Sequence, residues 1–304
     1  MDIETLRIFA EVAHRGSFSE VARSRGTEPS SISRAVGVIE AELGERLFHR
    51  TTRKLSLTEA GALYLARIEP LVAQLEEAGA EARAIGRGPV GTLRLSVSVS
   101  YGMVRVMPML ARFRAQYPEL TVELLMSDTQ VDLVREGIDL AVRLAPAVEA
   151  NLIATRLVAT RYRVVAAPEW LAAHPLAVPA DLAACEALRF TLAGFRDRWI
   201  FRDGGGTEDV VPVGGRLLIS SALGLREAAL AGMGPALLAD WMIADDLASG
   251  RLVDCFPAHD VAATDFDTGV WAIYPSRNFL PGKVRAMLDF LRAELPRPQV
   301  LAAR

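Results

Sequence analysis

Cysteine and histidine are scarce in this sequence, whose 304 residues include two cysteines and four histidines. Cys185 and Cys255 are too few for a disulfide framework or a cysteine metal cluster, which fits a reducing compartment. The histidines, at positions 14, 49, 174 and 259, do not have the spacing of a shared metal site. We therefore expect neither a metal ion nor a bound cofactor.

The common signatures of catalytic sites are also missing. The sequence contains no HExxH, GxSxG, P-loop or CxxC motif. The glycines at 204–206 are typical of a hairpin turn and not of a phosphate cradle, because no helix is expected to begin after them. These absences argue against an enzyme.

Long hydrophobic runs and a strong excess of one charge are lacking as well. No uninterrupted apolar stretch approaches the roughly twenty residues of a membrane span, and the opening MDIETLRIFAEV does not resemble a signal sequence. We therefore expect a cytoplasmic protein with no membrane partner. A net charge of −3 argues against a protein that coats nucleic acid non-specifically, and 51% hydrophobic residues allow two or three units with real cores.

Residues 17–44 predict two short helices joined by a tight turn. Ser17 and Glu20 have the spacing of a capping box at the start of the first helix. Gly26 is typical of a helix end, and Pro29 is typical of the first turn of the helix that follows. The pattern is that of a helix-turn-helix.

The second of these helices has two distinct faces. One face is apolar and is built from residues three or four positions apart, namely Ile32, Val36, Ile39 and Leu43. The other face carries small hydroxyls and one cation near the start of the helix, namely Ser30, Ser31, Ser33 and Arg34. Small hydroxyls beside an arginine suit the floor of a DNA major groove.

A short basic hairpin is expected after Gly44, in the segment RLFHRTTRKLSLT. Its cations are Arg46, Arg50, Arg53 and Lys54. Such a hairpin beside a recognition helix is a wing, which contacts phosphates or the minor groove. Each part alone has an ordinary structural explanation, since helix pairs are common and charge runs are usually solvated. Their order, with eight Lys or Arg against five Glu over residues 15–54, favours DNA binding through Ser30, Ser31, Ser33, Arg34, Arg50, Arg53 and Lys54.

A long helix is expected from residue 59, capped by Thr58. Its apolar residues recur in steps of three and four: Gly61, Tyr64, Ile68, Leu71, Leu75, Ala78, Ala82 and Ile85. This repeat predicts a coiled-coil seam, in which Tyr64, Ile68, Leu71 and Leu75 pair with a second copy of the chain. An amphipathic helix packed on its own domain is the alternative.

The glycine-rich stretch at 86–91 predicts a domain boundary, after which strands and helices alternate. Strands are expected at 93–99, 121–126, 139–144, 216–220, 235–239 and 270–274. Helices are expected at 106–116, 131–136, 222–231, 242–249 and 283–295. This alternation predicts βαβ units and a mostly parallel sheet.

Polar residues follow several of these strands, where an α/β sheet binds its ligands. The candidates for binding a small anion are Ser98, Ser100, Tyr101, Thr129, Ser220 and Ser221, with Arg143 as the balancing charge. Serine is also an ordinary helix cap, and an arginine at a strand end can simply brace a hinge. The residues alone leave both readings open.

The sequence resembles the LysR-type transcriptional regulators in FAEVAHRGSFSEVA at residues 9–22 and in PSSISRAVGVIEAELGERLFHRTTRKLSLTEAG at residues 29–61. The resemblance implies an α/β protein in three parts: a winged helix-turn-helix at 1–58, a linker helix at 59–88 and an effector domain at 89–304. The effector domain would resemble periplasmic binding proteins, with one subdomain at about 89–161 and 268–304 and another at about 162–267. The expected partners are double-stranded promoter DNA, a small-molecule effector and further copies of the chain as a dimer or tetramer, with RNA polymerase as another candidate.

Two positions depart from the family's usual pattern. Glu28 stands where a small hydroxyl cap is usual, and Ala35 stands where Gln is frequent. A carboxylate at position 28 is expected to accept hydrogen bonds from the free amides of the helix start and to oppose an approaching phosphate. The alternative is that Glu28 turns away and Thr27 caps the helix instead. A small-molecule-binding protein that has lost tight DNA binding is therefore the alternative function.

Overall fold

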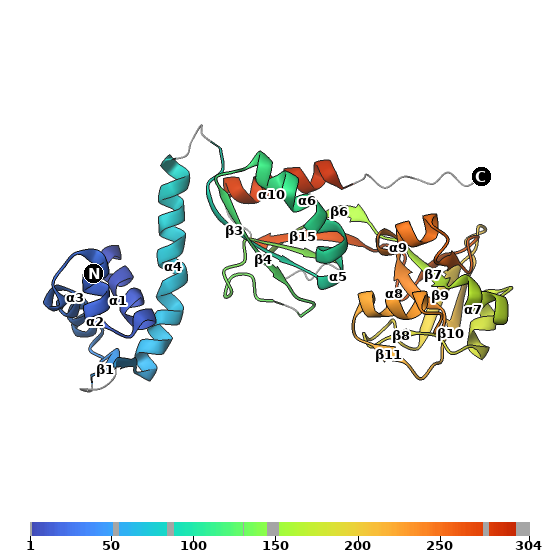
Figure 1. Ribbon diagram of the computed structural model, residues 1–304, viewed down its shortest axis with the longest axis horizontal. Helices are drawn as coiled ribbons and strands as arrows, with labels where there is room; N and C mark the ends of the chain where they lie inside the picture. The colour runs from blue at the N-terminus through green and yellow to red at the C-terminus, as the bar shows by residue number, and fades with distance from the viewer. Residues whose placement is uncertain are drawn as a thin grey trace. The chain divides into compact units, whose positions relative to one another are not determined.

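The computed structural model describes residues 2–50, 55–83, 88–129, 131–144, 152–275 and 280–295. The chain divides into two compact units, Met1–Gly91 and Thr92–Arg304 (Figure 1). Among the described residues, none of the helices combines the length and the apolar character needed to cross a membrane.

The first unit is mainly helical. Its elements are α1 (Ile3–Arg15), α2 (Phe18–Arg25), α3 (Pro29–Leu43), β1 (Phe48–Arg50), β2 (Leu55–Leu57) and α4 (Glu59–Arg83). Ser17 Oγ accepts a hydrogen bond from the Glu20 backbone N–H at 3.2 Å, and Gly26 ends α2 with φ of 64°. The predicted helix pair is confirmed, and local capping chemistry defines both ends of α2.

The apolar face of α3 is buried as the sequence predicted, with one exception. Ile32, Val36 and Ile39 lie in the core with Phe9 and Phe48, whereas Leu43 is 40% exposed. The expectation that Leu43 faces inward is therefore wrong. Gly44 ends the helix immediately after it, so the last turn lies at the edge of the core.

The predicted hairpin is present, with β1 and β2 antiparallel and Phe48 opposite Leu57. Glu40 of α3 joins it to the helix. This carboxylate is 5% exposed and accepts from the backbone N–H groups of Leu47 at 2.9 Å and Phe48 at 3.3 Å, while Arg46 pairs with its other oxygen at 2.9 Å. Helix and hairpin are thus held together by one buried acceptor.

The predicted seam residues of the linker helix α4 lie in two different environments. Ile68 is buried in the core of its own unit, and Tyr64 packs against Phe9 with ring centroids 5.6 Å apart. Ile68 thus follows the alternative of a helix packed on its own domain. Tyr64 is half-buried in its own unit, and its pairing with a second copy stays a prediction. Leu71 and Leu75 are 62% and 50% exposed, and for them pairing with a second copy stays a prediction.

The second unit begins with a mixed sheet of order β4-β3-β5-β15-β6. Its strands are β3 (Gly91–Val97), β4 (Leu120–Met126), β5 (Leu140–Arg143), β6 (Leu152–Ala159) and β15 (Gly269–Pro275). Strands β3 and β5 are parallel, while β15 is antiparallel to both β5 and β6. A helical stretch made of α5 (Val99–Tyr101), η1 (Gly102–Val106) and α6 (Met107–Gln116) follows β3.

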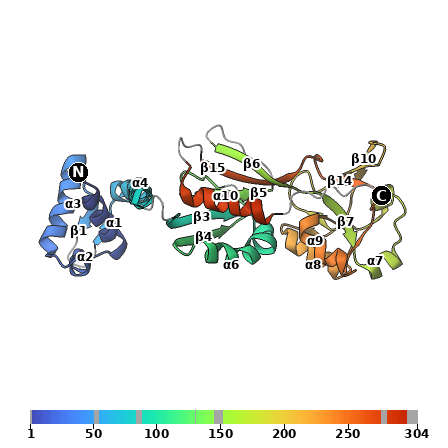
Figure 2. The ribbon, with the colours of Figure 1, turned by 90° about the horizontal axis from the view of Figure 1, so that it is seen from above.

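Helices α6 and α10 (Gly282–Glu294) lie side by side over one face of this sheet (Figures 1 and 2). Phe113 and Phe290 pack edge to face between them with centroids 5.2 Å apart. At one end Lys283 is almost fully buried and donates to Asp139 Oδ2 at 2.6 Å and to the Thr92 carbonyl at 2.7 Å. The chain's last helix is thereby fixed to the start of the unit.

A second sheet, of order β10-β9-β14-β7-β12, follows along the chain. Its strands are β7 (Tyr162–Ala166), β9 (Arg198–Arg202), β10 (Glu208–Pro212), β12 (Ala236–Ala239) and β14 (Asp260–Ala262), with β13 (Val253–Asp254) also paired to β7. Helices α8 (Ala222–Leu230) and α9 (Asp240–Ala248) cover one face. The remaining elements are α7 (Pro168–Ala173), η2 (Pro179–Ala184) and the parallel pair β8 (Arg189–Phe190) and β11 (Leu218–Ile219).

Two expectations for this unit are wrong. The second sheet is antiparallel throughout its named pairings, so the prediction of a mostly parallel sheet fails there. The helix expected at 131–136 is a run of turns, in which Asp132 Oδ1 accepts from the N–H groups of Val134 and Arg135 and Gly137 reverses the chain with φ of 65°. Asp132 thus caps a single turn, in which the Glu136 N–H donates to the Asp132 carbonyl at 2.9 Å, and Gly137 ends it before a helix forms.

We expect Glu40→Ala to lower the free energy of unfolding of the first unit by about 1–3 kcal/mol, because two buried N–H groups lose their acceptor. All four tryptophans lie beyond residue 169. The unfolding midpoint followed by far-ultraviolet circular dichroism should therefore fall. The unfolding midpoint followed by tryptophan emission, which reports on the second unit, should stay the same. The control is Glu45→Ala, which alters an exposed glutamate near the same helix end. Equal unfolding midpoints for Glu40→Ala and the wild type would show that the carboxylate does not stabilise the first unit.

We expect Leu71→Asp to give smaller assemblies in sedimentation velocity, because a charge placed in an apolar seam is desolvated without a partner. Gln74→Asp adds the same charge at an exposed position of α4 and serves as the control. Tryptophan emission of both variants should match the wild type. An unchanged sedimentation coefficient for Leu71→Asp would refute a seam at this residue.

Candidate functional site

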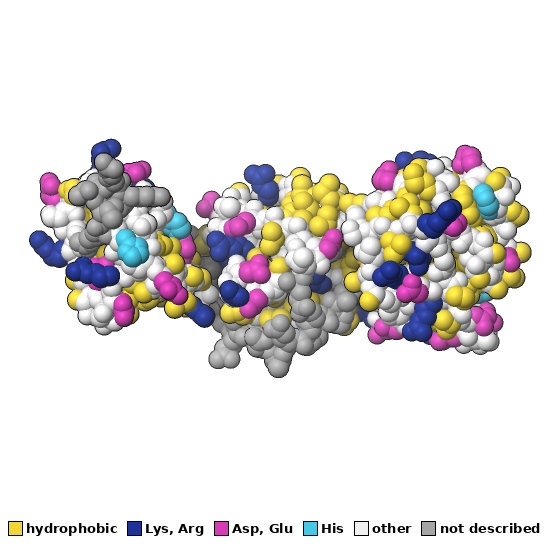
Figure 3. Space-filling view, turned by 90° about the horizontal axis from the view of Figure 1, so that it is seen from below, with side chains coloured by type: hydrophobic (Ala, Val, Ile, Leu, Met, Phe, Trp, Pro, Cys, Tyr) yellow, Lys and Arg dark blue, Asp and Glu magenta, His cyan; other side chains and the backbone are white. Residues whose placement is uncertain are grey.

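The first candidate site is the exposed face of α3. Ser30, Ser31 and Arg34 are exposed near the start of this helix, and Ser33 is half-buried. Arg50 ends strand β1, and its side chain lies outside the described part of the structure, as do residues Arg53 and Lys54. Figure 3 shows cationic and acidic side chains interspersed over the visible surface of this unit. Recognition by such a surface depends on the geometry of a few side chains more than on bulk charge.

Glu28 occupies the N-cap position of α3, directly before Pro29. Its side chain is exposed and makes no capping hydrogen bond, while its backbone carbonyl accepts from the Ser31 N–H at 2.9 Å. The expected internal satisfaction of the helix amides by this carboxylate is therefore wrong. The other part of the expectation stays a prediction: the negative charge of Glu28, at the N-terminus of α3 near Ser30, Ser31 and Arg34, opposes an approaching phosphate.

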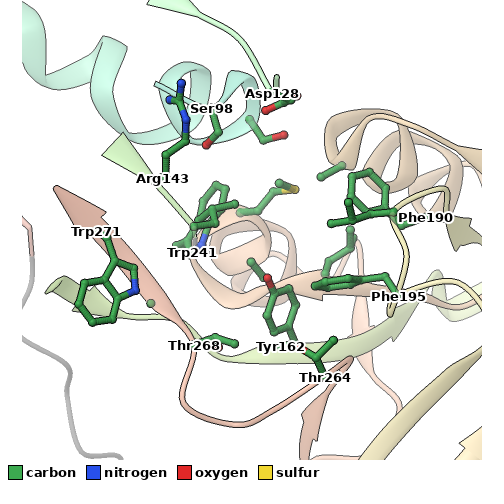
Figure 4. Close-up of a pocket in the computed structure, with 18 of the residues that line it drawn as sticks. Ser98, Asp128, Arg143, Tyr162, Phe190, Phe195, Trp241, Thr264, Thr268 and Trp271 are labelled. Carbon is green, nitrogen blue, oxygen red and sulfur yellow. The ribbon is translucent and has the colours of Figure 1, made fainter. Parts of the chain in front are cut away.

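The second candidate site is a pocket of about 850 Å³ in the second unit, lined by residues from both sheets, which we name the inter-sheet pocket (Figure 4). Of the residues that the sequence assigned to an effector site, five line this pocket: Ser98, Ser100, Thr129, Arg143 and Ser220. These residues lie at or just after the ends of β3, β4, β5 and β11, so separate segments meet at one place, as the strand-end rule predicts.

Tyr101 and Ser221 do not line the inter-sheet pocket. Tyr101 is 1% exposed, and its ring packs edge-on against Trp241 at 4.9 Å, where it supports the pocket from behind. Ser221 Oγ accepts from the Gly224 N–H at 3.3 Å and caps α8. Both assignments are corrected, and for Ser221 the ordinary cap explanation holds.

Arg143 contributes the one cationic side chain among the described residues that line the pocket. Its guanidinium donates to Ser96 Oγ at 2.8 Å and to the Val142 carbonyl at 3.1 Å. Burial lowers the pKa of Arg143, and the nearby Asp128 acts in the opposite direction. Asp128 itself accepts from the Val99 N–H at 2.9 Å, so it already satisfies the first amide of α5.

Ser98 lies beside Arg143 in the pocket (Figure 4). It is 7% exposed, and its hydroxyl has no hydrogen-bond partner among the described residues. An unpaired buried hydroxyl costs free energy that a bound acceptor would recover. The geometry therefore suits an anion near Ser98 and Arg143.

An aromatic surface that the strand-end rule did not predict lies on the other side of the pocket. It consists of Tyr162, Phe190 and Phe195, which we name the aromatic wall. Phe195 packs edge-on against Tyr162 at 5.4 Å and against Phe190 at 6.0 Å. Burial, with a contribution from Asp240, raises the pKa of Tyr162 to about 12, so its phenol stays protonated and can donate.

Trp241 and Trp271 also line the pocket. Trp241 comes two residues after Ala239, the last residue of β12. The rule that selected the serines at strand ends would have found it if aromatic residues had been considered with the polar ones. Phe190 and Phe195 had no such signal, because β8 is only two residues long.

Comparisons with known proteins agree with this arrangement. Residues 3–62 match the model of the bacterial regulatory helix-turn-helix proteins of the lysR family, and residues 86–296 match the LysR substrate binding domain. The HTH-type transcriptional regulator CrgA of Neisseria meningitidis serogroup C is 32% identical over 96% of both chains.

Solved structures give the same answer for the whole chain. The structure of CrgA from Neisseria meningitidis has a TM-score of 0.61 at 31% identity and covers 97% of this chain and 99% of its own. The full-length Vibrio cholerae virulence activator AphB has a TM-score of 0.60 at 28% identity, over 97% of this chain and 100% of its own. These relatives are transcription factors and not enzymes. The chain belongs to the LysR family of bacterial helix-turn-helix transcriptional regulators.

Proposed function

We propose that this protein is a cytoplasmic regulator that binds promoter DNA as a dimer or tetramer and senses a small anionic or polar effector in the inter-sheet pocket. Helix α3 enters the major groove with Ser30, Ser31, Ser33 and Arg34 toward the bases, and the hairpin places Arg50, Arg53 and Lys54 near phosphates. The functional parts are residues 1–58, 59–88 and 89–304. RNA polymerase is a further proposed partner at the promoter.

The observation that supports this function best is the presence of both candidate sites in one chain of this family. An exposed hydroxyl and arginine face on a helix-turn-helix has the chemistry of base recognition. A pocket lined from two sheets has the chemistry of a sensor, because its ligand contacts both sheets at once.

The proposed mechanism is a shift of population. Ser98, Thr129 and Arg143 belong to the first sheet's segments, and Tyr162 and Phe195 belong to the second. A ligand that touches both groups favours the state in which they are close. In an oligomer that change alters how the DNA-binding units are presented to two half-sites.

The direct test is selection of binding sites from a random DNA pool with the full-length protein. We expect enrichment of a two-fold symmetric site, because a dimer presents two copies of α3. Fluorescence anisotropy with the selected site and a scrambled site then measures specificity at several salt concentrations. Failure to enrich any sequence would contradict the function and favour the alternative of a small-molecule-binding protein without tight DNA binding.

We expect Arg34→Ala to weaken binding to the selected site by about 1–3 kcal/mol, because a bidentate base contact is lost. Binding to the scrambled site should weaken far less. Arg23→Ala removes an exposed arginine from α2 and is the control. Its effect should be small and equal for both DNAs. An equal loss on both DNAs for Arg34→Ala would show that Arg34 contacts phosphate and not a base.

We expect Glu28→Gln to tighten DNA binding at low salt by the order of 1 kcal/mol, because a negative charge is removed from the helix end that meets a phosphate. The gain should shrink as salt is raised. Anisotropy at two ionic strengths measures both effects.

Glu28→Ser separates charge from capping at the same position. A serine at this N-cap can accept from the helix amides that Glu28 leaves uncapped, so stability should rise by about 0.5–1 kcal/mol in addition to the gain in DNA affinity. DNA affinities of both variants equal to wild type at low salt would show that Glu28 lies away from the DNA.

A further inference from the structure

The inter-sheet pocket has two chemically different ends. The polar end consists of Ser98, Ser100, Asp128, Thr129 and Arg143, and the aromatic wall consists of Tyr162, Phe190 and Phe195. Figure 4 shows Ser98 and Arg143 together on one side and the three rings of the wall together on another. The rest of the lining is largely apolar and includes Trp241, Met242, Leu225 and Leu237.

The polar end can hold one negative group. Arg143 has two of its five N–H donors engaged, both with neutral oxygens, and no carboxylate of the described residues is within ion-pairing distance of it. Ser98 offers a buried hydroxyl without a partner. A carboxylate beside both would receive a charge-assisted hydrogen bond from each.

The rest of the pocket disfavours a second negative group. Of the three carboxylates of the lining, Asp128 lies near Arg143 and accepts from the Val99 N–H, whereas Asp265 and Asp267 are exposed and Asp267 pairs with Arg156. A ligand carboxylate placed far from Arg143 would therefore meet the like charge of Asp265 and Asp267 or lie against the aromatic wall. Neither placement gives it a cationic partner.

The aromatic wall and the pocket volume favour a large apolar body. The rings are only partly buried in the structure, and they present faces and edges to the same space. Aromatic side chains in this arrangement pack well against a planar ring. A volume of about 850 Å³ is in the range of pockets for drug-sized ligands, so a four-carbon acid would leave most of it unfilled.

We infer that the effector is an amphipathic monoanion, with one carboxylate at Ser98 and Arg143 and a ring-bearing apolar body against Tyr162, Phe190 and Phe195. This inference rests on the proposed sensing function and specifies its ligand class. It distinguishes ring-bearing monocarboxylates from small dicarboxylates, which need two cationic or donor-rich ends.

The test is calorimetric titration of the full-length protein, without DNA, by three probes: 3-(2-naphthyl)propanoate, its primary amide and succinate. We expect saturable binding of the naphthyl acid, affinity for the amide lower by about ten-fold because the charged partner of Arg143 is lost, and no saturable binding of succinate. Succinate binding as tightly as the naphthyl acid, amide binding as tightly as the acid, or no saturable binding of the naphthyl acid would each overturn the inference.

Two variants locate the ligand's ends. Ser98→Ala should lower the affinity for the acid more than that for the amide, because only the bond to the carboxylate is charge-assisted. Phe195→Ala should lower both affinities by a similar factor. Ser249→Ala, whose hydroxyl bonds to Asp245 away from the pocket lining, is the control for both. Identical acid affinities for Ser98→Ala and Ser249→Ala would overturn the placement of the carboxylate.

These titrations are independent of DNA binding. Tight binding of the naphthyl acid by a protein that selects no DNA site would uphold the ligand class and reject the regulatory function. Selection of a DNA site by a protein that prefers succinate would reject the ligand class alone.

Discussion

The second unit depends on the two short stretches of chain that pass between its sheets. Thr160 donates its N–H to the Thr268 carbonyl at 3.0 Å, and Thr268 Oγ1 donates to the Thr160 carbonyl at 2.7 Å. The two crossings are therefore tied to one another. A Cβ added at Gly269 would lie 2.8 Å from the Val158 carbonyl oxygen, so the second crossing has to enter its strand through glycine. Two adjacent crossings between two sheets are the arrangement of a hinge.

The sequence predicted the local features of the fold well, because their causes are local. Ser17, Gly26, Pro29 and Thr58 each act through their own backbone or the next turn, and each helix end follows from them. The hairpin at residues 203–206 is confirmed for the same reason, since it joins β9 to β10. The prediction that the apolar face of α3 is buried was wrong only at Leu43, in the last turn of the helix.

Features that depend on distant pairing could not be read from one segment. Strand β6 was missed, and it exists because it pairs along its length with β15, more than a hundred residues later. The prediction of parallel strands in the second sheet was wrong for the same reason, because β7 pairs with β12, β13 and β14, which come much later in the chain. Helix α4 shows the related limit for periodicity. A spacing of three and four residues shows that Tyr64 and Leu71 share a face, but not that Tyr64 meets its own unit while Leu71 meets solvent.

The residues of the candidate site also divide into those that the sequence predicted and those that depend on distant packing. The strand-end rule found Ser98, Ser100, Thr129, Arg143 and Ser220, because the rule concerns where chain segments converge and not which side chains fill the space. It did not find the aromatic wall, because the wall is assembled from β7, the short β8 and the loop after it. The burial that places Tyr101 behind Trp241 is likewise a property of the packed unit.

The division of the pocket also limits which ligands can act as signals. A ligand shifts an equilibrium only by the difference in its interaction free energy with the two states. The polar end belongs to the first sheet's segments, and a small anion held there keeps the same contacts whatever the position of the second sheet. The aromatic wall belongs to the second sheet. A ligand must reach from one to the other before its binding depends on their separation, so length and an apolar body are requirements of the signal as well as of the fit.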